Sequence, residues 1–269
     1  MPGYQTKQES IAVAGVADLF IRSLLDRQQF ADPLGEADRL GISSATWPLF
    51  GLLWPSGAQL AAALALRPVQ AGERILELGC GLALASLVGH RRGADITASD
   101  CHPLAGAFLL ENLRLNGLLP MKYRHGHWGA PAALVPSVPP LVLPLISALP
   151  LDAPVSGLFD LIIGSDLLYE RDADGGLAGY IDGHAAPVVE VWIVDPDRGN
   201  RSAFNRQMAD RGFDRHEQRL NTAPTLGGSG EARYKGRLLV YRRGGPATRP
   251  MLAAASSESP SMRAAGPLT

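Results

Sequence analysis

Residues 74–83 read RILELGCGLA, and this short stretch decides how the rest of the chain is interpreted. A short apolar strand ends in a tight Gly-x-Gly turn, and helical character begins at Ala83. Glycines allow a ligand to approach the backbone closely, and the N-terminus of the following helix offers free N–H groups. Such a turn serves dinucleotides and S-adenosylmethionine alike, so it predicts a cofactor site without choosing between them.

Apolar runs and helical segments alternate around this turn. Strands are predicted at 74–78, 95–99, 122–128, 159–164 and 188–194, and helices at 58–66, 83–90, 103–116 and 200–211. This alternation indicates a parallel sheet that is buried on both faces. Residues 215–221 and 236–241 flank a Gly-rich turn and predict an antiparallel hairpin. The sequence therefore predicts an α/β, Rossmann-like three-layer sandwich, with a mostly parallel seven-stranded sheet and an antiparallel C-terminal hairpin.

Other segments differ from this alternating pattern. Residues 1–46 are predicted as an N-terminal extension, with a strand at 17–22 and a loop or lid after it. Residues 47–243 form the main domain, interrupted at 130–157 by prolines too frequent for a helix or a central strand. Residues 244–269 contain Ala, Ser, Pro and Gly without an aromatic residue, and predict a disordered tail.

The composition argues against several classes of protein. Of the 269 residues, 46% are hydrophobic, which argues against global disorder. The formal net charge of -1 gives no overall excess of basic residues for binding DNA or RNA. The sequence contains no run of about 18 apolar residues, so it predicts no membrane-spanning helix. Cys80 and Cys101 form neither a disulfide framework nor a zinc pattern. We therefore expect a cytoplasmic protein without a metal, a membrane or a nucleic-acid partner.

Two carboxylates separate the possible cofactors. Asp100 ends the next predicted strand, 21 residues after Gly79, where it can accept hydrogen bonds from both ribose hydroxyls. The dinucleotide fingerprint expects a third glycine where Leu84 stands. Glu77, an acidic residue ahead of the first glycine, is more typical of methyltransferases, in which it can hold the ammonium of the cofactor's methionine. The alternative interpretation of Glu77 is a helix-capping or surface carboxylate.

A third polar group follows the predicted strand at 159–164. Residues 164–169 read GSDLLY, and ligands of open α/β sheets bind beyond the carboxyl ends of the strands. Asp166 is therefore a candidate to position a lysine ammonium and help remove its proton, and Tyr169 a candidate wall of the acceptor channel. The alternative is that Asp166 caps a helix and that Tyr169 belongs to the core.

The order of these motifs along the chain resembles one family. The set consists of Trp54-Pro55-Ser56-Gly57, Glu77-Leu78-Gly79-Cys80-Gly81, Ala98-Ser99-Asp100, Asn112 with Asn116, Trp128, and the stretch from Phe159 to Tyr169. Together they resemble the seven-strand methyltransferases often called methyltransferase family 16, several of which methylate lysines of specific proteins. The resemblance covers roughly residues 47–241 and implies a sheet with a reversed final strand.

The resemblance also implies a cofactor, a partner and roles for particular residues. The cofactor is S-adenosylmethionine, with S-adenosylhomocysteine as product, and the partner is a protein that carries the methylated side chain. The implied cofactor-binding residues are Trp54, Glu77, Gly79, Cys80, Gly81, Asp100, Trp128 and Ser165, and the implied catalytic residues are Asp166 and Tyr169. Trp128 is expected near the adenine and Trp54 over the cofactor, with core packing as the alternative for both. The family commonly has another glycine where this chain has Ala83.

Other functions stay open on the residues alone. Amide- and adenine-directed methyltransferases often carry Asn-Pro-Pro-Tyr where this chain has Asp166 to Tyr169. This difference disfavours a small molecule or a nucleic acid as the methyl acceptor, but it does not exclude either. A cofactor-binding module without catalysis is a second alternative. An NAD-dependent oxidoreductase is disfavoured by Leu84, and no Gly-x-Ser-x-Gly elbow follows a strand, as a hydrolase requires. For His102, a surface position is expected over contact with the cofactor.

Overall fold

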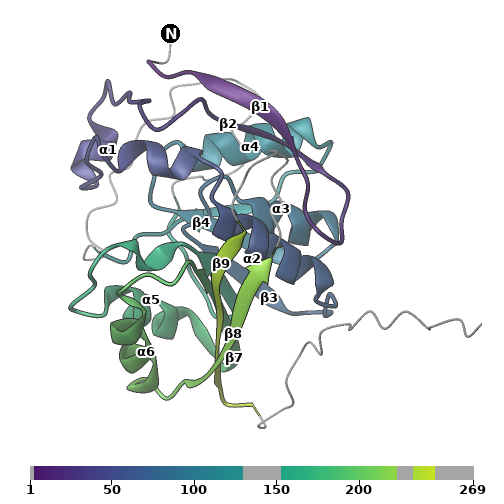
Figure 1. Cartoon of the computed structure of the whole chain (residues 1–269), viewed down its shortest axis with the longest axis vertical. Coiled ribbons are helices and arrows are strands. Elements are labelled where there is room, and N and C mark those ends of the chain that lie inside the picture. Colours follow the sequence, from purple (N-terminus) through teal and green to yellow (C-terminus); the bar gives the residue numbers. More distant parts are fainter. Residues whose placement is uncertain (1–2, 130–152, 223–232, 246–269) are drawn as a thin grey trace, which may run out of the picture.

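The computed structural model describes residues 3–129, 153–222 and 233–245, and its main feature is a sheet of seven strands (Figure 1). The strand order is β5-β4-β3-β6-β7-β9-β8. Neighbouring pairs are parallel except those that involve β9, which runs against both β7 and β8. The bounds are β3 Arg74–Leu78, β4 Asp95–Asp100, β5 Lys122–His125, β6 Phe159–Ser165, β7 Ala185–Asp195, β8 Asp214–Thr222 and β9 Tyr234–Arg243. The predicted α/β fold with its reversed last strand is confirmed.

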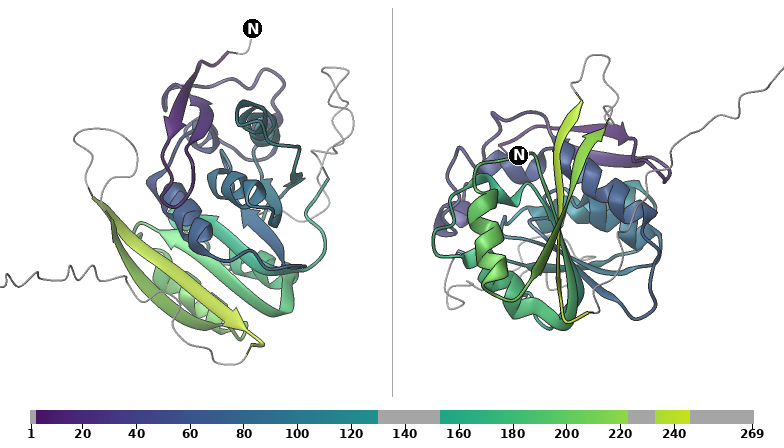
Figure 2. Two further views of the ribbon diagram at one scale, coloured as in Figure 1. Left: turned by 90° about the vertical axis from the view of Figure 1, so that its right-hand side faces the viewer. Right: turned by 60° about the horizontal axis from the view of Figure 1, so that its bottom comes forward.

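Helices cover both faces of the sheet, as the right-hand view in Figure 2 shows. Helices α2 (Pro55–Leu66), α3 (Leu84–Arg91) and α4 (Ala105–Leu115) belong to one face, and α5 (Gly176–His184) and α6 (Arg201–Ala209) to the other. Successive strand residues point to opposite faces, so Ile75 packs with the first group of helices and Leu76 with the second. The predicted three-layer arrangement follows from these two buried faces.

A two-stranded hairpin, β1 (Thr6–Ile11) and β2 (Leu19–Leu24), lies over α4 as a further layer (Figure 1). Asn112 of α4 accepts a hydrogen bond from the Arg22 backbone N–H at 2.8 Å and donates one to the Arg22 carbonyl oxygen. One helical turn later, Asn116 makes the same pair of bonds with Phe20. The two amide side chains therefore complete the open edge of β2, which gives a physical reason for the Asn112 and Asn116 motif.

The segment between the hairpin and α2 leads the chain back over the sheet. It contains the four-residue helix α1 (Glu36–Arg39) and the 3₁₀ helix η1 (Trp47–Gly51). Trp47 is buried and packs edge-on against Phe50 and His102. The predicted N-terminal extension thus shares one hydrophobic core with α2, α3 and α4.

Helix α5 is an element that the sequence analysis did not predict. Its sequence GLAGYIDGH holds three glycines, each of which disfavours a helix by about 1 kcal/mol relative to alanine. Leu177, Ala178 and Ile181 are nevertheless buried against the sheet. The Asp172 carboxylate accepts the first backbone N–H groups, from Gly176 and Leu177, at 2.9 Å each. Tertiary burial and this cap outweigh the weak local propensity.

The bounds of several predicted segments differ from those in the structure, most of all for the third strand. The third strand ends at His125, so Trp128 follows it in a loop instead of closing the strand. Of the predicted Pro-rich loop, residues 130–152 lie outside the described residues, as do residues 246–269 of the predicted tail. The described end of that loop is partly ordered by pairing, because Pro154 forms a parallel bridge with His125 at the edge of the sheet.

Candidate active site

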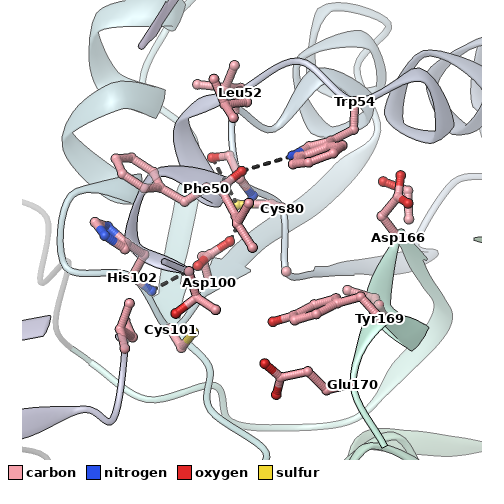
Figure 3. A pocket seen from close by; sticks show the side chains of 18 of the residues that line it. Phe50, Leu52, Trp54, Cys80, Asp100, Cys101, His102, Asp166, Tyr169 and Glu170 are labelled. Carbon is pink, nitrogen blue, oxygen red and sulfur yellow. Dashed lines mark hydrogen bonds between the residues drawn. The ribbon is translucent and has the colours of Figure 1, made fainter. Parts of the chain in front are cut away.

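A cavity of about 610 Å³ opens at the carboxyl ends of β3, β4 and β6. Nine of the ten candidate site residues line it, namely Trp54, Gly79, Cys80, Gly81, Asp100, Trp128, Ser165, Asp166 and Tyr169. Its size falls in the range of small-molecule and cofactor sites. The structure therefore brings together residues that are more than a hundred positions apart in the chain (Figure 3).

The glycine turn is packed too closely by Phe50 and Leu167 to accept side chains. Gly79 and Gly81 both have positive φ angles, 55° and 52°. A Cβ atom at Gly81 would lie 2.9 Å from the Phe50 carbonyl oxygen, and one at Gly79 would lie 2.6 Å from the Leu167 side chain. Ala83 adopts φ 58°, in the left-handed region, at the N-cap of α3. The turn keeps the glycine-like backbone that the family pattern expects even though position 83 carries a methyl group.

Asp100 connects the end of β4 to the glycine turn. One carboxylate oxygen accepts the Gly81 N–H and the other accepts the His102 N–H, both at 2.8 Å. Burial raises the pKa of Asp100, and these backbone hydrogen bonds oppose that effect. Each carboxylate oxygen retains further acceptor capacity on the cavity wall. Asp100 is thus placed where a ribose can reach it, and its predicted role stays a prediction.

His102 is a buried residue, and its predicted surface location is wrong. Only 3% of it is exposed, and its ring stacks on Phe50 with centroids 3.7 Å apart. Burial lowers the pKa of His102 to about 3, so the ring is neutral at physiological pH. The stacked pair lines the cavity and fixes η1 against the turn after β4.

Glu77 does not line the cavity, in contrast to the expectation that it contacts the methionine end of a cofactor. It is 3% exposed, and its carboxylate accepts hydrogen bonds from the backbone N–H and the hydroxyl group of Ser86 in α3. Burial raises the pKa of Glu77 to about 7. The carboxylate caps α3 beneath the glycine turn, so the alternative interpretation as a helix-capping group is the one that the structure supports.

Asp166 stands just beyond β6 in the left-handed conformation, with φ 58°. Its Oδ1 forms an ion pair with Arg198 at 2.7 Å, and its side chain is 13% exposed. Its Oδ2 is buried and has no hydrogen-bonding partner of normal geometry among the described residues. Burial raises the pKa of Asp166, and the Ser56 hydroxyl and Arg198 oppose that effect.

Arg198 is a cavity residue that the sequence analysis did not select as a candidate. Its loop follows β7, where the buried Asp195 accepts the Arg198 backbone N–H at 2.8 Å. This hydrogen bond fixes the turn from which the guanidinium reaches Asp166. Burial also raises the pKa of Asp195.

Aromatic side chains form other walls of the cavity. Trp54, at the N-cap of α2, donates its indole N–H to the Leu49 carbonyl at 2.9 Å and lies under the Arg27 guanidinium. Trp128 lies against Gly79 from the loop after β5. Arg27 also lines the cavity. It comes from the segment predicted as a loop or lid, in which no motif singled it out.

One end of the cavity is lined by Tyr169, the last residue of the 3₁₀ helix η2 (Leu167–Tyr169), and by Glu170, which follows it. Tyr169 is 48% exposed, so the alternative of a core tyrosine is wrong. Figure 3 shows the tyrosine ring and the Glu170 side chain next to one another at the same end of the cavity. Ser165, the last residue of β6, precedes Asp166 on the same wall.

Two further classes of site find no support in the part of the chain that the structure describes. Among residues 3–129, 153–222 and 233–245, no group of three or more His, Cys, Asp or Glu residues could hold a metal ion. Within the same residues no helix has the length and apolar character needed to cross a lipid bilayer.

Comparison with curated proteins finds relatives that share one name. The electron transfer flavoprotein beta subunit lysine methyltransferase of Danio rerio is 28% identical over 164 residues, which cover 59% of this chain and 54% of that protein. The Mus musculus protein of the same name is 30% identical over 154 residues, covering 56% of this chain and 51% of that protein. This chain thus spans about half the length of the curated relatives that it matches. No family model matches it.

Solved structures with a similar arrangement include two methyltransferases. The ribosomal protein L11 methylase of Lactobacillus delbrueckii subsp. bulgaricus has a TM-score of 0.47 and 17% identity, covering 71% of this chain and 81% of that one. A methyltransferase of Pyrococcus furiosus has a TM-score of 0.47 and 15% identity, covering 68% and 80%. The sequence relatives confirm the resemblance predicted from the motifs: over 59% of its length, this chain is similar to protein lysine methyltransferases.

Proposed function

We propose that this protein binds S-adenosylmethionine and transfers its methyl group to a lysine side chain of another protein. The observation that carries the proposal is that the glycine turn, which cannot accept side chains, lies with the Asp100 carboxylate on one cavity wall. The lysine methyltransferases to which the chain is similar favour this chemistry over the dinucleotide alternative.

The cavity fits this cofactor in several respects. The glycine turn presents bare backbone, and Asp100 offers carboxylate oxygens that suit vicinal hydroxyl groups. Trp54 and Trp128 supply flat apolar surfaces on which an adenine or a methionine chain packs. When bound, the cofactor supplies an activated methyl group on a sulfonium centre.

The chain's own residues contribute positioning and exclusion of water, which are the main tasks in this reaction. η1 covers the turn, because the Phe50 carbonyl lies against Gly81. Asp166 and Tyr169 form the opposite wall, where we place the acceptor. The ion pair with Arg198 holds the Asp166 side chain in one orientation.

Binding of S-adenosylhomocysteine tests the cofactor directly. We expect calorimetry to give micromolar binding by the wild type and none with NAD. Asp100→Ala should reduce affinity at least about tenfold, because two hydrogen bonds to a charged group contribute about 1.5–3 kcal/mol each. The matched control is Asp95→Ala, at the opposite, exposed end of β4, which should bind as the wild type does. Stronger binding of NAD than of S-adenosylhomocysteine would overturn the proposal.

The acceptor is tested with the protein that the relatives' names supply. Labelled S-adenosylmethionine and purified electron transfer flavoprotein beta subunit should give a labelled lysine, identified by mass spectrometry. Asp166→Asn should lower the rate of transfer while binding of S-adenosylhomocysteine stays within about twofold, because Asp166 lies on the acceptor wall. Labelling of small molecules in place of proteins in a cell extract would contradict the lysine assignment and leave the cofactor assignment intact.

A further inference from the structure

Among the residues that the structure describes, three carboxylates line the cavity, and they differ in what they already bind. Asp100 accepts two backbone N–H groups through its two oxygens. Asp166 is ion-paired with Arg198. Glu170 is exposed and makes no hydrogen bond or ion pair with another described residue. Of the three, Glu170 is the carboxylate with both oxygens available to a ligand.

Asp166 is poorly suited to attract an ammonium group, although its position after β6 suggested that role. The Arg198 guanidinium 2.7 Å from Oδ1 neutralises its charge and repels a second cation. Its remaining oxygen, Oδ2, has essentially no exposed surface. An incoming lysine would have to displace Arg198, which the hydrogen bond between its backbone N–H and Asp195 holds in place.

Glu170 has the opposite properties. It directly follows Tyr169, whose ring is half exposed on the cavity wall. Figure 3 shows the Glu170 carboxylate beside the Tyr169 hydroxyl and on the far side of the cavity from Trp54. The aromatic ring next to this carboxylate offers a surface for the aliphatic part of a lysine and for its cation.

We propose that Glu170, together with the ring of Tyr169, recognises the ammonium group of the acceptor lysine, and that Asp166 is a positioning residue held by Arg198. This proposal rests on the proposed function, since it assigns the acceptor side of the same site. Glu170 attracts the charged form of the lysine to the cavity, and the lysine loses its proton to solvent before it reacts.

A small probe tests the site without the protein acceptor. Binding of n-butylammonium is measured by NMR titration of the Trp54 and Trp128 indole signals, with and without S-adenosylhomocysteine, and n-butanol serves as the uncharged analogue. We expect wild-type protein to prefer the ammonium at least about tenfold at low salt, a preference that weakens as salt screens the charge. Glu170→Gln should remove most of this preference.

Two variants make the result specific. Asp174→Asn, an exposed carboxylate four residues further along and outside the cavity lining, should keep the full preference. Asp166→Asn leaves the Arg198 guanidinium without its partner, so it should weaken the preference, but by less than Glu170→Gln does. The proposal is overturned if the wild type shows no preference for the ammonium, or if Glu170→Gln lowers the preference no more than Asp166→Asn does. Failure of S-adenosylhomocysteine to bind would instead refute the assigned cofactor. The two failures can be told apart, because the titration of the free protein does not need the cofactor.

Discussion

Replacing Asn112 with leucine tests the idea that α4 holds the N-terminal hairpin through side-chain amides. The Asn112 side chain is fully buried, and it pairs with both backbone groups of Arg22, at 2.8 Å and 3.4 Å. Leucine has a similar size, so Asn112→Leu removes the two hydrogen bonds without leaving a large cavity. The Arg22 N–H and carbonyl groups then lack their partner.

The magnitude follows from the burial of these groups. An unpaired buried donor or acceptor costs about 1–3 kcal/mol, but Arg22 is half-buried and the longer bond contributes less. We therefore expect the free energy of unfolding to fall by about 2 kcal/mol, and Tm by about 4–8 °C for a chain of this size. Asn116→Leu, whose bonds to Phe20 are exposed, should cost about 1 kcal/mol or less because water replaces them.

Urea unfolding followed by tryptophan fluorescence gives the free energies, and hydrogen exchange reports the Arg22 amide directly. We expect Asn112→Leu to raise the exchange rate of that amide more than the rates in the central strands, because the hairpin edge opens locally. The reasoning is refuted if Asn112→Leu changes stability by less than about 0.5 kcal/mol and leaves Arg22 exchange unchanged.

Two further predictions concern the residues around the glycine turn. Ala83→Gly should stabilise the protein by up to about 1 kcal/mol, because the release of left-handed backbone strain exceeds the loss of a buried methyl group. The control Ala85→Gly, inside α3, should destabilise the protein by about 1 kcal/mol or more. Equal losses of stability for the two variants in thermal unfolding would contradict this prediction. Burial raises the pKa of Glu77 to about 7, so the folded state binds this proton more tightly than the unfolded state, and the associated stability is present below pH 4.5 and lost as the pH rises to about 7. Glu77→Gln should therefore gain stability relative to wild type across this window, and a constant difference in Tm from pH 4 to 8 would refute that assignment.

The sequence by itself determined the main sheet of this protein and most of the helices that cover it. The alternation of apolar strands with helical segments predicted the parallel sheet, and the Gly-rich turn near the C-terminus predicted its reversed last strand. Local patterns carry this information because side-chain periodicity and glycine conformations act over a few residues. The residues at the strand ends could also be predicted, since parallel strands bring their carboxyl ends to one edge of the sheet.

Only the tertiary structure decided what each of those side chains contacts. Glu77 and Asp100 both end up near the glycine turn, but one side chain lies beneath it against Ser86 and the other lies on the cavity wall. The Asp166 partner, Arg198, is 32 residues away in the chain, and Arg27 reaches the cavity from the N-terminal segment. Helix α5 forms despite its glycines because the sheet buries one side of it. Such contacts depend on how distant segments pack, and packing of that kind leaves no periodic signal in the sequence.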